Sequence, residues 1–263
     1  MNIDRFVAVG DSITEGLSDK TPFGGYRGWA DRVADELARQ NPEFRYANFA
    51  IRGKLLEQIV DEQLPSALKL VNGPTTLFSF HAGANDVLRP KLDLDKVINL
   101  YSSTVEKISR TQAQLILFTI REIRNPRTPL EKLWNTRFEP YNDNVRKTAV
   151  RYKTFLVDPN AFPFLGDRRL LAPDRLHLNS EGHRRMAAAA LSEIGLPHDP
   201  DWKDPLPIIK QSSPAIETLK TASWVGLFVI PWLLRRVSGK SSGERKSAKY
   251  PQLITWPIHQ ILD

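Results

Sequence analysis

The stretch RFVAVGDSITEG, residues 5–16, decides the fold and holds the first candidate functional residue. The apolar run Phe6–Val9 predicts a buried β-strand, and the Gly10-Asp11-Ser12 turn follows it directly. Ser12 is therefore expected on a strand-to-loop turn. In an open α/β sheet, a residue in this position projects above the carboxyl ends of the strands, where such folds bind ligands.

Two later segments provide groups that can activate this serine. A serine hydroxyl is a weak nucleophile until a neighbouring base removes its proton. His177 is the candidate base, since imidazole titrates near working pH and can later protonate a leaving group. Asp174 precedes it by three residues in DRLH, residues 174–177, so its carboxylate can accept a hydrogen bond from the ring and fix the productive tautomer.

Candidate donors for a developing oxyanion follow the predicted strands. Attack on a carbonyl group places negative charge on its oxygen, which requires fixed hydrogen-bond donors. The backbone N–H of Ser12 and the side-chain amide of Asn85, in GAND at residues 83–86, are candidates from their positions. Gly53 follows the second predicted strand, but spacing alone does not select it from the 14 glycines.

Each motif also has an ordinary structural explanation. Gly-Asp-Ser is commonly a plain turn, and Asn85 and Asp86 can serve as turn and helix-capping residues. We expect Asp86 to cap the segment that follows it even if Asn85 is catalytic. The pair Asp174 and His177 also fits a surface loop or half of a metal site. The occurrence of four such blocks in one order, each at the end of a sheet element, favours a catalytic site.

In these four blocks the sequence resembles the GDSL hydrolases, also called the SGNH superfamily, over residues 5–197. The resemblance implies a three-layer α/β/α flavodoxin-like sandwich with a mostly parallel sheet of about five strands. It implies hydrolysis of carboxylic esters through an acyl-serine intermediate. It assigns catalytic roles to Ser12, Asp174 and His177, and an oxyanion hole to Ser12, Gly53 and Asn85. Three linking segments are similar to its intracellular actinobacterial-type branch: residues 25–29, 46–48 and 174–178.

Short apolar runs alternate with longer amphipathic ones, which is typical of βαβ units. The predicted strands are Phe6–Val9, Phe44–Asn48, Thr75–Phe80, Gln114–Thr119 and Thr154–Val157. The predicted helices are Trp29–Arg39, Leu55–Leu64, Leu94–Arg110, Tyr141–Tyr152 and Glu181–Ile194, the last capped by Ser180 and ended by Gly195. We expect a hydrolase domain at residues 1–198 and a basic C-terminal extension at 199–263, made of a connector, an apolar helix and a flexible tail.

Composition limits the possible functions. The net charge of the 263-residue chain is +7, but residues 202–263 carry nine Lys and Arg against four Asp and Glu. The expected domain is therefore nearly neutral, which argues against a nucleic-acid partner. The absence of cysteine excludes disulfides and a cysteine nucleophile. No zinc-type spacing or Gly-rich phosphate loop is present, so we expect neither metal nor cofactor. Without a signal-peptide pattern at its start, we expect the chain to be cytoplasmic.

The extension and one long loop suggest further roles. Residues 215–237 look helical, and the apolar run 222–234 is about 13 residues, short of the roughly 20 that span a bilayer. Docking on the domain is the preferred interpretation over peripheral membrane contact, which Trp224, Trp232, Arg235 and Arg236 motivate. The long loop 121–140 is expected to set specificity as a lid or pocket wall, or else to be an ordinary surface loop.

The leading hypothesis is a serine ester hydrolase that acts on small-molecule or lipid-like acyl esters. An acyltransferase or a carbohydrate deacetylase with the same residues is the alternative among enzymes. A membrane-surface binding protein that acts through residues 215–237 is the alternative of another class. Of the other histidines, His81 ends the third predicted strand and is expected near the pocket, whereas His183 is expected to pack or lie exposed within its helix. The sequence specifies no oligomeric state.

Overall fold

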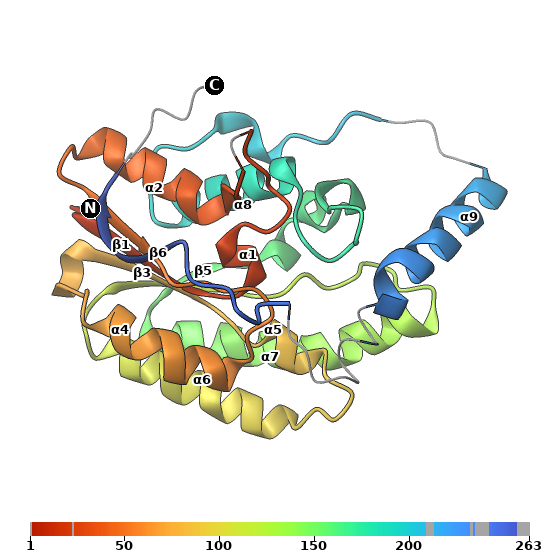
Figure 1. Ribbon diagram of the computed structural model, residues 1–263, viewed down its shortest axis with the longest axis horizontal. Coiled ribbons are helices and arrows are strands. Elements are labelled where there is room, and N and C mark those ends of the chain that lie inside the picture. The colour runs from red at the N-terminus through yellow and green to blue at the C-terminus, as the bar shows by residue number, and fades with distance from the viewer. Residues whose placement is uncertain (1, 23, 209–212, 232–233, 235–241, 257–263) are drawn as a thin grey trace.

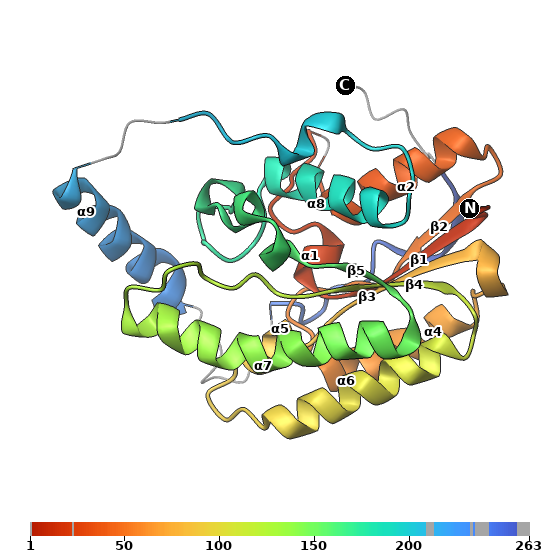
Figure 2. The same ribbon diagram turned by 180° about the vertical axis from the view of Figure 1, so that it is seen from behind.

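The computed structural model describes residues 2–22, 24–208, 213–231, 234 and 242–256. Six strands form one sheet in the order β5-β4-β3-β1-β2-β6, with helices on both faces (Figures 1 and 2). The first five strands are parallel, so the predicted α/β fold with a mostly parallel sheet is confirmed. Their bounds are β1 Arg5–Gly10, β2 Arg45–Asn48, β3 Thr76–His81, β4 Gln114–Phe118 and β5 Phe155–Val157.

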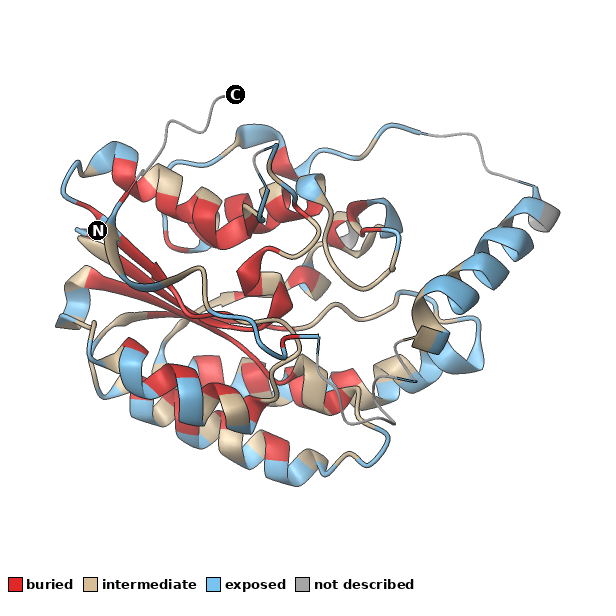
Figure 3. Ribbon diagram, viewed as in Figure 1, coloured by how far each residue is buried: buried red, intermediate tan, exposed pale blue. Residues whose placement is uncertain are grey.

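Alternation along β1 builds the two outer layers, because successive side chains of a strand point to opposite faces. Phe6 and Ala8 pack in a cluster with α2 and α8, whereas Val7 and Val9 pack in a second cluster with the helices of the other face. Strands β1 to β4 are almost entirely buried (Figure 3). The first face carries α2 (Gly28–Gln40) and α8 (Ser180–Glu193); the second carries α3 (Leu56–Gln58), η1 (Ile59–Gln63), α4 (Leu64–Leu68), α6 (Leu94–Ser109) and α7 (Pro129–Tyr152).

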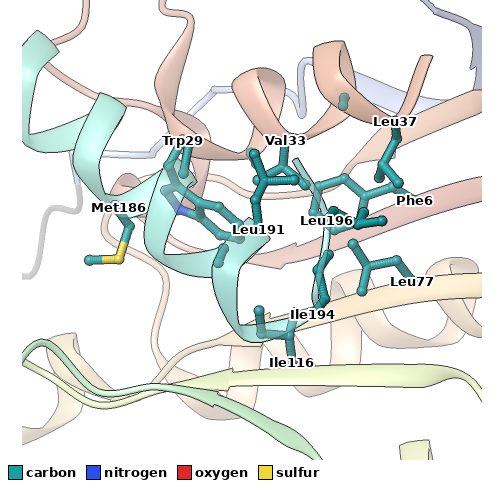
Figure 4. Close-up of a cluster of buried hydrophobic side chains, with 14 of the residues drawn as sticks. Phe6, Trp29, Val33, Leu37, Leu77, Ile116, Met186, Leu191, Ile194 and Leu196 are labelled. Atoms are coloured by element: carbon teal, nitrogen blue, oxygen red, sulfur yellow. The ribbon is translucent and has the colours of Figure 1, made fainter. Parts of the chain in front are cut away.

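Helix α8 packs closely on the sheet because small side chains face the core. Its alanines at 187–190 are buried, and Leu191 packs with Trp29 of α2 and with the sheet residue Phe6 (Figure 4). The Trp29 ring lies 4.6 Å from the ring of Phe118, between centroids. Asn179 caps the helix by accepting from the N–H of Gly182, so the predicted cap at Ser180 is one residue late. The helix therefore starts directly after the loop that holds the candidate acid and base.

Helix α7 begins at Pro129, and the prediction of a loop over 121–140 followed by a helix from Tyr141 is wrong. Thr128 accepts from the N–H of Glu131, whose carboxylate accepts in return from the N–H of Thr128. This capping box starts the helix, and buried Phe138 and Tyr141 anchor it. Pro140 lies inside the helix and removes one donor without ending it.

Part of the expected flexible tail is a sixth strand. β6 (Tyr250–Thr255) pairs antiparallel with the outer edge of β2, so the prediction of a tail is wrong for these residues. Pro251 is tolerated because β6 is an edge strand. Trp256 follows it and is 3% exposed, with its indole N–H on Asp35 at 2.8 Å. The sheet therefore uses residues from both sides of position 198.

The rest of the extension is a connector and a separate helix. Trp202 in η6 (Pro200–Lys203) is buried against the rings of Phe162 and Phe164. Helix α9 (Pro214–Trp224) and η7 (Val225–Val229) follow, apart from the body except at one end (Figure 1). Within the described part of the chain, no helix is long and apolar enough to cross a membrane. Trp232, Arg235 and Arg236 lie outside the described residues. Five shorter elements complete the fold: η2 (Gly73–Thr75), α5 (Ala84–Val87), η3 (Pro159–Ala161), η4 (Pro163–Gly166) and η5 (Arg168–Leu170).

Candidate active site

Ser12 is the first residue of α1 (Ser12–Glu15), one helical turn that follows β1 without an intervening loop. The Asp11 carboxylate caps this turn by accepting from the N–H of Ile13 at 3.3 Å. A side chain at Gly10 would place a Cβ 2.6 Å from the carbonyl oxygen of His81, so only glycine allows β1 to turn this close to β3. The turn thus presents Ser12 at the carboxyl end of the central strand.

Hydrogen bonds join Ser12, His177 and Asp174 in a chain. His177 Nε2 lies 3.0 Å from Ser12 Oγ, and His177 Nδ1 lies 2.6 Å from Asp174 Oδ2. The other carboxylate oxygen of Asp174 accepts from the backbone N–H groups of Leu176 and His177, each at 3.0 Å. The structure brings these three predicted residues together across more than 160 positions of sequence.

The loop that carries the acid and the base is closed on itself. Leu171 and Leu178 form an isolated antiparallel bridge, and the N–H of Ala172 donates to the carbonyl of His177 at 2.8 Å. Arg175 completes the turn with a φ of 61°, in the left-handed region. These internal bonds hold the Asp174 carboxylate and the His177 imidazole in one relative position.

The charge state of Asp174 fits its contact with His177. Burial by itself raises the pKa of this carboxyl, but the hydrogen bond from His177, the charge of that ring and two backbone amides outweigh burial and hold the pKa below its usual value. An ionised carboxylate can only accept hydrogen bonds, so the Nδ1 atom that faces Asp174 must be the donor. The hydrogen bonds therefore assign the single proton of the neutral ring to Nδ1. Nε2 then has a free lone pair for the Ser12 hydroxyl.

Asn85 lies in α5, directly after β3, and lines the same cavity as Ser12 and His177. Its Nδ2 donates to Asp11 Oδ2 and to the carbonyl of Lys54, both at 3.1 Å. Gly53 precedes Lys54 in the loop after β2, with a φ of 73°. The loops after β1, β2 and β3 therefore meet at the Asn85 amide.

Two neighbouring acids have roles that the sequence did not indicate. Asp86 Oδ2 accepts from the N–H of Leu56, the first residue of α3, at 2.8 Å, so Asp86 caps an earlier helix. The expectation that it caps the segment after it is wrong, since Asp93 caps α6. Asp11 is buried and holds the Asn85 amide. Burial raises the pKa of Asp11 to about 6. The only sequence signal for Asp11 is its place inside the Gly-Asp-Ser turn.

The family model of GDSL-like lipases and acylhydrolases matches residues 8–185 of this sequence. The chain belongs to this GDSL-like lipase/acylhydrolase family. It is accordingly a carboxylic ester hydrolase, as the four sequence blocks implied.

Solved structures of the same fold include esterases. An acetylxylan esterase, Axe2 from Geobacillus stearothermophilus, superposes with a TM-score of 0.61 at 24% identity, covering 75% of this chain and 98% of that one. An α/β hydrolase enzyme from the metagenome of Lake Arreo, Spain, superposes with a TM-score of 0.58 at 22% identity, covering 73% and 95%. At these identities the likeness concerns the fold. No curated protein matches the chain.

The cavity of this GDSL-like hydrolase is mostly apolar beyond its catalytic edge. The β4–α7 segment, which was expected to form a pocket wall, contributes Ile120, Arg121, Trp134 and Phe138. The Trp134 indole N–H donates to the carbonyl of Arg121 at 2.8 Å and fixes this wall. Further apolar lining comes from α1, the end of α5, η4, η5, the loop 171–178 and α8: Ile13, Leu88, Leu165, Leu170, Leu171, Leu176, Leu178 and Met186.

Two further histidines are near the hydrolase site but have no acidic partner there. His81 borders the cavity, as expected, and stacks on Phe118 with ring centroids 4.9 Å apart. His183 is buried in α8, where its Nδ1 accepts from the N–H of Trp29 and its Nε2 donates to the carbonyl of Leu17. Burial lowers the pKa of each ring to about 4, so both are neutral at neutral pH. Across the described residues, no three His, Asp or Glu side chains are grouped to hold a metal ion.

Proposed function

We propose that this GDSL-like hydrolase cleaves carboxylic esters through an acyl-serine intermediate formed on Ser12. His177 is the general base and acid, and Asp174 fixes its orientation and charge. The observation that supports these roles is the unbroken hydrogen-bond chain, 3.0 Å from Ser12 Oγ to Nε2 and 2.6 Å from Nδ1 to Asp174. This geometry meets the requirements of nucleophilic catalysis by an alcohol.

In the first half-reaction, His177 Nε2 removes the hydroxyl proton while Ser12 Oγ attacks the ester carbon. The carbonyl oxygen becomes negative and binds the backbone N–H groups of Ser12 and Gly53 and the amide of Asn85. In the structure Asn85 Nδ2 donates to Asp11 Oδ2 and to the Lys54 carbonyl, which uses both of its hydrogens, so one of these bonds is exchanged for the bond to the oxyanion. The tetrahedral adduct then collapses, and the leaving alcohol takes the proton from Nε2.

In the second half-reaction, water replaces the alcohol. His177 takes a proton from the water, which attacks the acyl carbon, and the same oxyanion donors stabilise the second adduct. Collapse releases the carboxylic acid and returns the proton to Ser12 Oγ. The Asp174 carboxylate stays ionised throughout and stabilises the imidazolium formed in each half-reaction.

Substitution of the nucleophile tests the mechanism. We expect Ser12→Ala to lower kcat for a short-chain p-nitrophenyl ester by about 10³- to 10⁶-fold, with the thermal unfolding midpoint unchanged. The matched control is Ser103→Ala, at an exposed position of helix α6, which should retain wild-type rates. His177→Ala should lose several orders of magnitude, and Asn85→Ala about 10²- to 10³-fold. Full activity in folded Ser12→Ala protein would refute the mechanism.

Acyl transfer and carbohydrate deacetylation use the same residues and are the second candidates. The shared fold of the acetylxylan esterase motivates deacetylation. The apolar cavity wall favours a lipophilic acyl group instead. Rates on an acetylated xylooligosaccharide and on a p-nitrophenyl octanoate separate these two, and product analysis with an added alcohol acceptor separates hydrolysis from transfer.

We also propose peripheral membrane contact through residues 215–237. The support is a set of apolar side chains on α9 and η7 that solvent reaches, including Leu219 at 69% and Leu227 at 70% exposure. Co-sedimentation with anionic phosphatidylglycerol vesicles tests this. The comparison protein carries a Gly-Ser linker of equal length in place of residues 213–234, because truncation after Pro200 would also remove β6. Equal partitioning of the two proteins rules the contact out.

The finer family placement is also a proposal. The segments at 25–29, 46–48 and 174–178 support membership of the intracellular actinobacterial-type branch. A cytoplasmic location fits the absence of cysteine. Fractionation of cells that express the chain, with detection by antibody, tests the location, and recovery outside the cytoplasm would contradict it.

A further inference from the structure

Arg121 is a cation in the wall of an apolar cavity. It follows β4 by three residues, is half-buried, and lines the same cavity as Ser12. Its guanidinium donates to the carbonyl of Gly166 at 3.5 Å, the limit of a hydrogen bond. Within the described residues, Arg121 forms no ion pair. Arginine is rarely buried in this way without an acid, since desolvation of an unpaired charge is costly.

The acids beside Arg121 in sequence are engaged elsewhere. Glu122 binds Arg146, which also binds Asp158. Glu131 accepts from two backbone N–H groups as the capping residue of α7. None of these carboxylates forms an ion pair with Arg121, although the charge of Glu131 acts on it from a distance, and Arg121 lines the cavity.

The charge of a second arginine, Arg168, acts on Arg121. Burial lowers the pKa of Arg121, the charge of Arg168 lowers it further, and Glu131 opposes them in part. Arg168 lies in η5, whose last residue, Leu170, lines the cavity. It too forms no ion pair with any described residue. Arg168 is exposed and lies outside the cavity lining, but its charge adds to the positive potential at Arg121, which favours an anion there.

The backbone around Arg121 is held rigidly. Its carbonyl accepts from the Trp134 indole N–H at 2.8 Å. Asn142 binds both the N–H and the carbonyl of Ile120, at 2.8 and 2.7 Å, and Asn160 Oδ1 accepts from the N–H of Glu122 at 2.7 Å. Fixed supports of this kind reduce the entropy lost when a ligand binds the side chain.

We infer that Arg121, with the help of Arg168, binds an oxyanion group carried by the ester substrate at a distance from the bond that is cleaved. The preferred substrate is then amphipathic: an apolar portion lies along the cavity wall, and a carboxylate or phosphate reaches the guanidinium. This inference rests on the proposed hydrolysis at Ser12. A planar guanidinium binds such groups through paired, charge-assisted hydrogen bonds.

Matched esters test the inference. Mono-4-nitrophenyl adipate carries a carboxylate, and 4-nitrophenyl 6-methylheptanoate carries an isopropyl group of similar shape at that position. A second pair, 4-acetoxybenzoate and 4-isopropylphenyl acetate, moves the charge to the alcohol side. For each pair, the ratio of kcat/KM between the anionic and the neutral ester is measured in the full-length protein. We expect the wild-type ratio to exceed 1 in one pair, which identifies the side that faces Arg121.

Variants then assign the preference to the arginines. Arg121→Met should lower that ratio by about 10- to 100-fold, Arg121→Lys by less, and Arg168→Met by about 2- to 5-fold. Arg124→Met, an exposed arginine on the same segment, is the matched control and should keep the wild-type ratio. Thermal melts confirm that each variant is folded.

The outcomes separate this inference from the proposed function. If neither member of either pair is hydrolysed, and Ser12→Ala behaves as wild type, the hydrolytic proposal fails. If both members are hydrolysed with no anionic preference, or if Arg121→Met leaves the ratio unchanged, the oxyanion site is refuted while hydrolysis stands. Added inorganic phosphate distinguishes the two oxyanions: it inhibits wild type more than Arg121→Met at a phosphate site, and inhibits neither at a carboxylate-selective site.

Discussion

Strand β6 and helix α9 belong to the same C-terminal extension, yet they relate to the body of the protein in opposite ways. β6 continues the sheet, is followed by buried Trp256, and is preceded by Lys249, whose ammonium reaches Asp31 at 2.6 Å. α9 and η7 contain the longer apolar run of the extension, residues 222–229 with no charged residue, but Leu219 is 69% and Leu227 70% exposed. The contacts of α9 with the body include two hydrogen bonds: the Trp224 indole donates to the carbonyl of Asp174, and the Arg175 guanidinium donates to the carbonyl of Lys220.

The difference shows that hydrophobicity does not decide which segment is integrated. β2 offers an unpaired edge of backbone groups, and β6 satisfies them. Asp31 is a buried carboxylate that requires a cation, and Lys249 provides it. Among the described residues, α9 does not pair with an open strand edge or neutralise a buried carboxylate. The integrated segment is thus the one that completes hydrogen bonds and charges already present in the core.

The largest expected effect follows from removing both segments. Truncation after residue 198 deletes β6 and the packing of Trp202 on Phe162 and Phe164. Each buried tryptophan lost costs about 3–5 kcal/mol, and the total stability of a domain is about 5–15 kcal/mol. We expect this chain to show no cooperative thermal transition by circular dichroism. Replacing residues 213–234 with a Gly-Ser linker of equal length should preserve the wild-type thermal transition. If the linker variant also fails to fold, α9 is as necessary for the fold as β6, which contradicts the comparison.

The next effect concerns the Lys249–Asp31 pair. Lys249→Met leaves a buried carboxylate without its cation, which should cost about 3–5 kcal/mol of unfolding free energy at pH 7.5. Burial raises the pKa of Asp31 to about 6, even with Lys249 present. Because the pKa of Asp31 is higher in the folded than in the unfolded state, the folded state binds the proton first as the pH falls. The folded state is therefore stabilised as the pH falls from about 6 toward the ordinary pKa of an Asp carboxyl. Loss of Lys249 raises the pKa of Asp31 further, so the unfolding free energy that Lys249→Met loses relative to wild type should be smaller at pH 5 than at pH 7.5. Urea unfolding at pH 7.5 and at pH 5 measures these free energies. An equal loss at the two pH values would contradict the prediction.

A smaller effect is expected where α9 contacts the acid–base loop. Trp224→Phe removes the donor to the Asp174 carbonyl but keeps a ring beneath Arg175, whose guanidinium lies 4.7 Å from the Trp224 ring. One hydrogen bond of about 0.5–1.5 kcal/mol predicts a fall in kcat/KM of about 2- to 10-fold, with an unchanged melting temperature. Steady-state kinetics and a thermal melt measure the two quantities. A large drop in melting temperature would instead show that α9 is part of the core.

The smallest effect is expected on the exposed face of α9. The double variant Leu219→Ser and Leu227→Ser removes side chains that are already exposed, so the unfolding free energy should change by no more than about 0.5 kcal/mol. Leu253→Ser in β6 is the matched comparison, because Leu253 is half-buried against the second core cluster. It should cost about 1–3 kcal/mol. Equal losses from the two changes would contradict the assignment of β6 as the integrated segment.

The positions of the parallel strands and the candidate site could be read from local patterns. The run Phe6–Val9 is buried as predicted, because a continuous apolar stretch has no stable place outside a core. The start of α7 was missed because residues 121–140 were predicted to be a loop. The capping box of Thr128 and Glu131 is a local signal that would have found it. Asp11 and Asp86 gave no such signal, since their partners lie on other loops.

The sequence by itself determined the parallel sheet and the order of the loops that carry Ser12, Asn85, Asp174 and His177, because strand periodicity and turn residues act over a few positions. The tertiary structure alone decided that a strand near the C-terminus closes the edge of β2, and that Arg121 lines the cavity beside Ser12 without an ion pair among the described residues. Both depend on backbone edges and charges that are distant in sequence and meet only in the folded chain. A local sequence pattern cannot show which distant strand edge or charged residue a segment will contact in the folded chain.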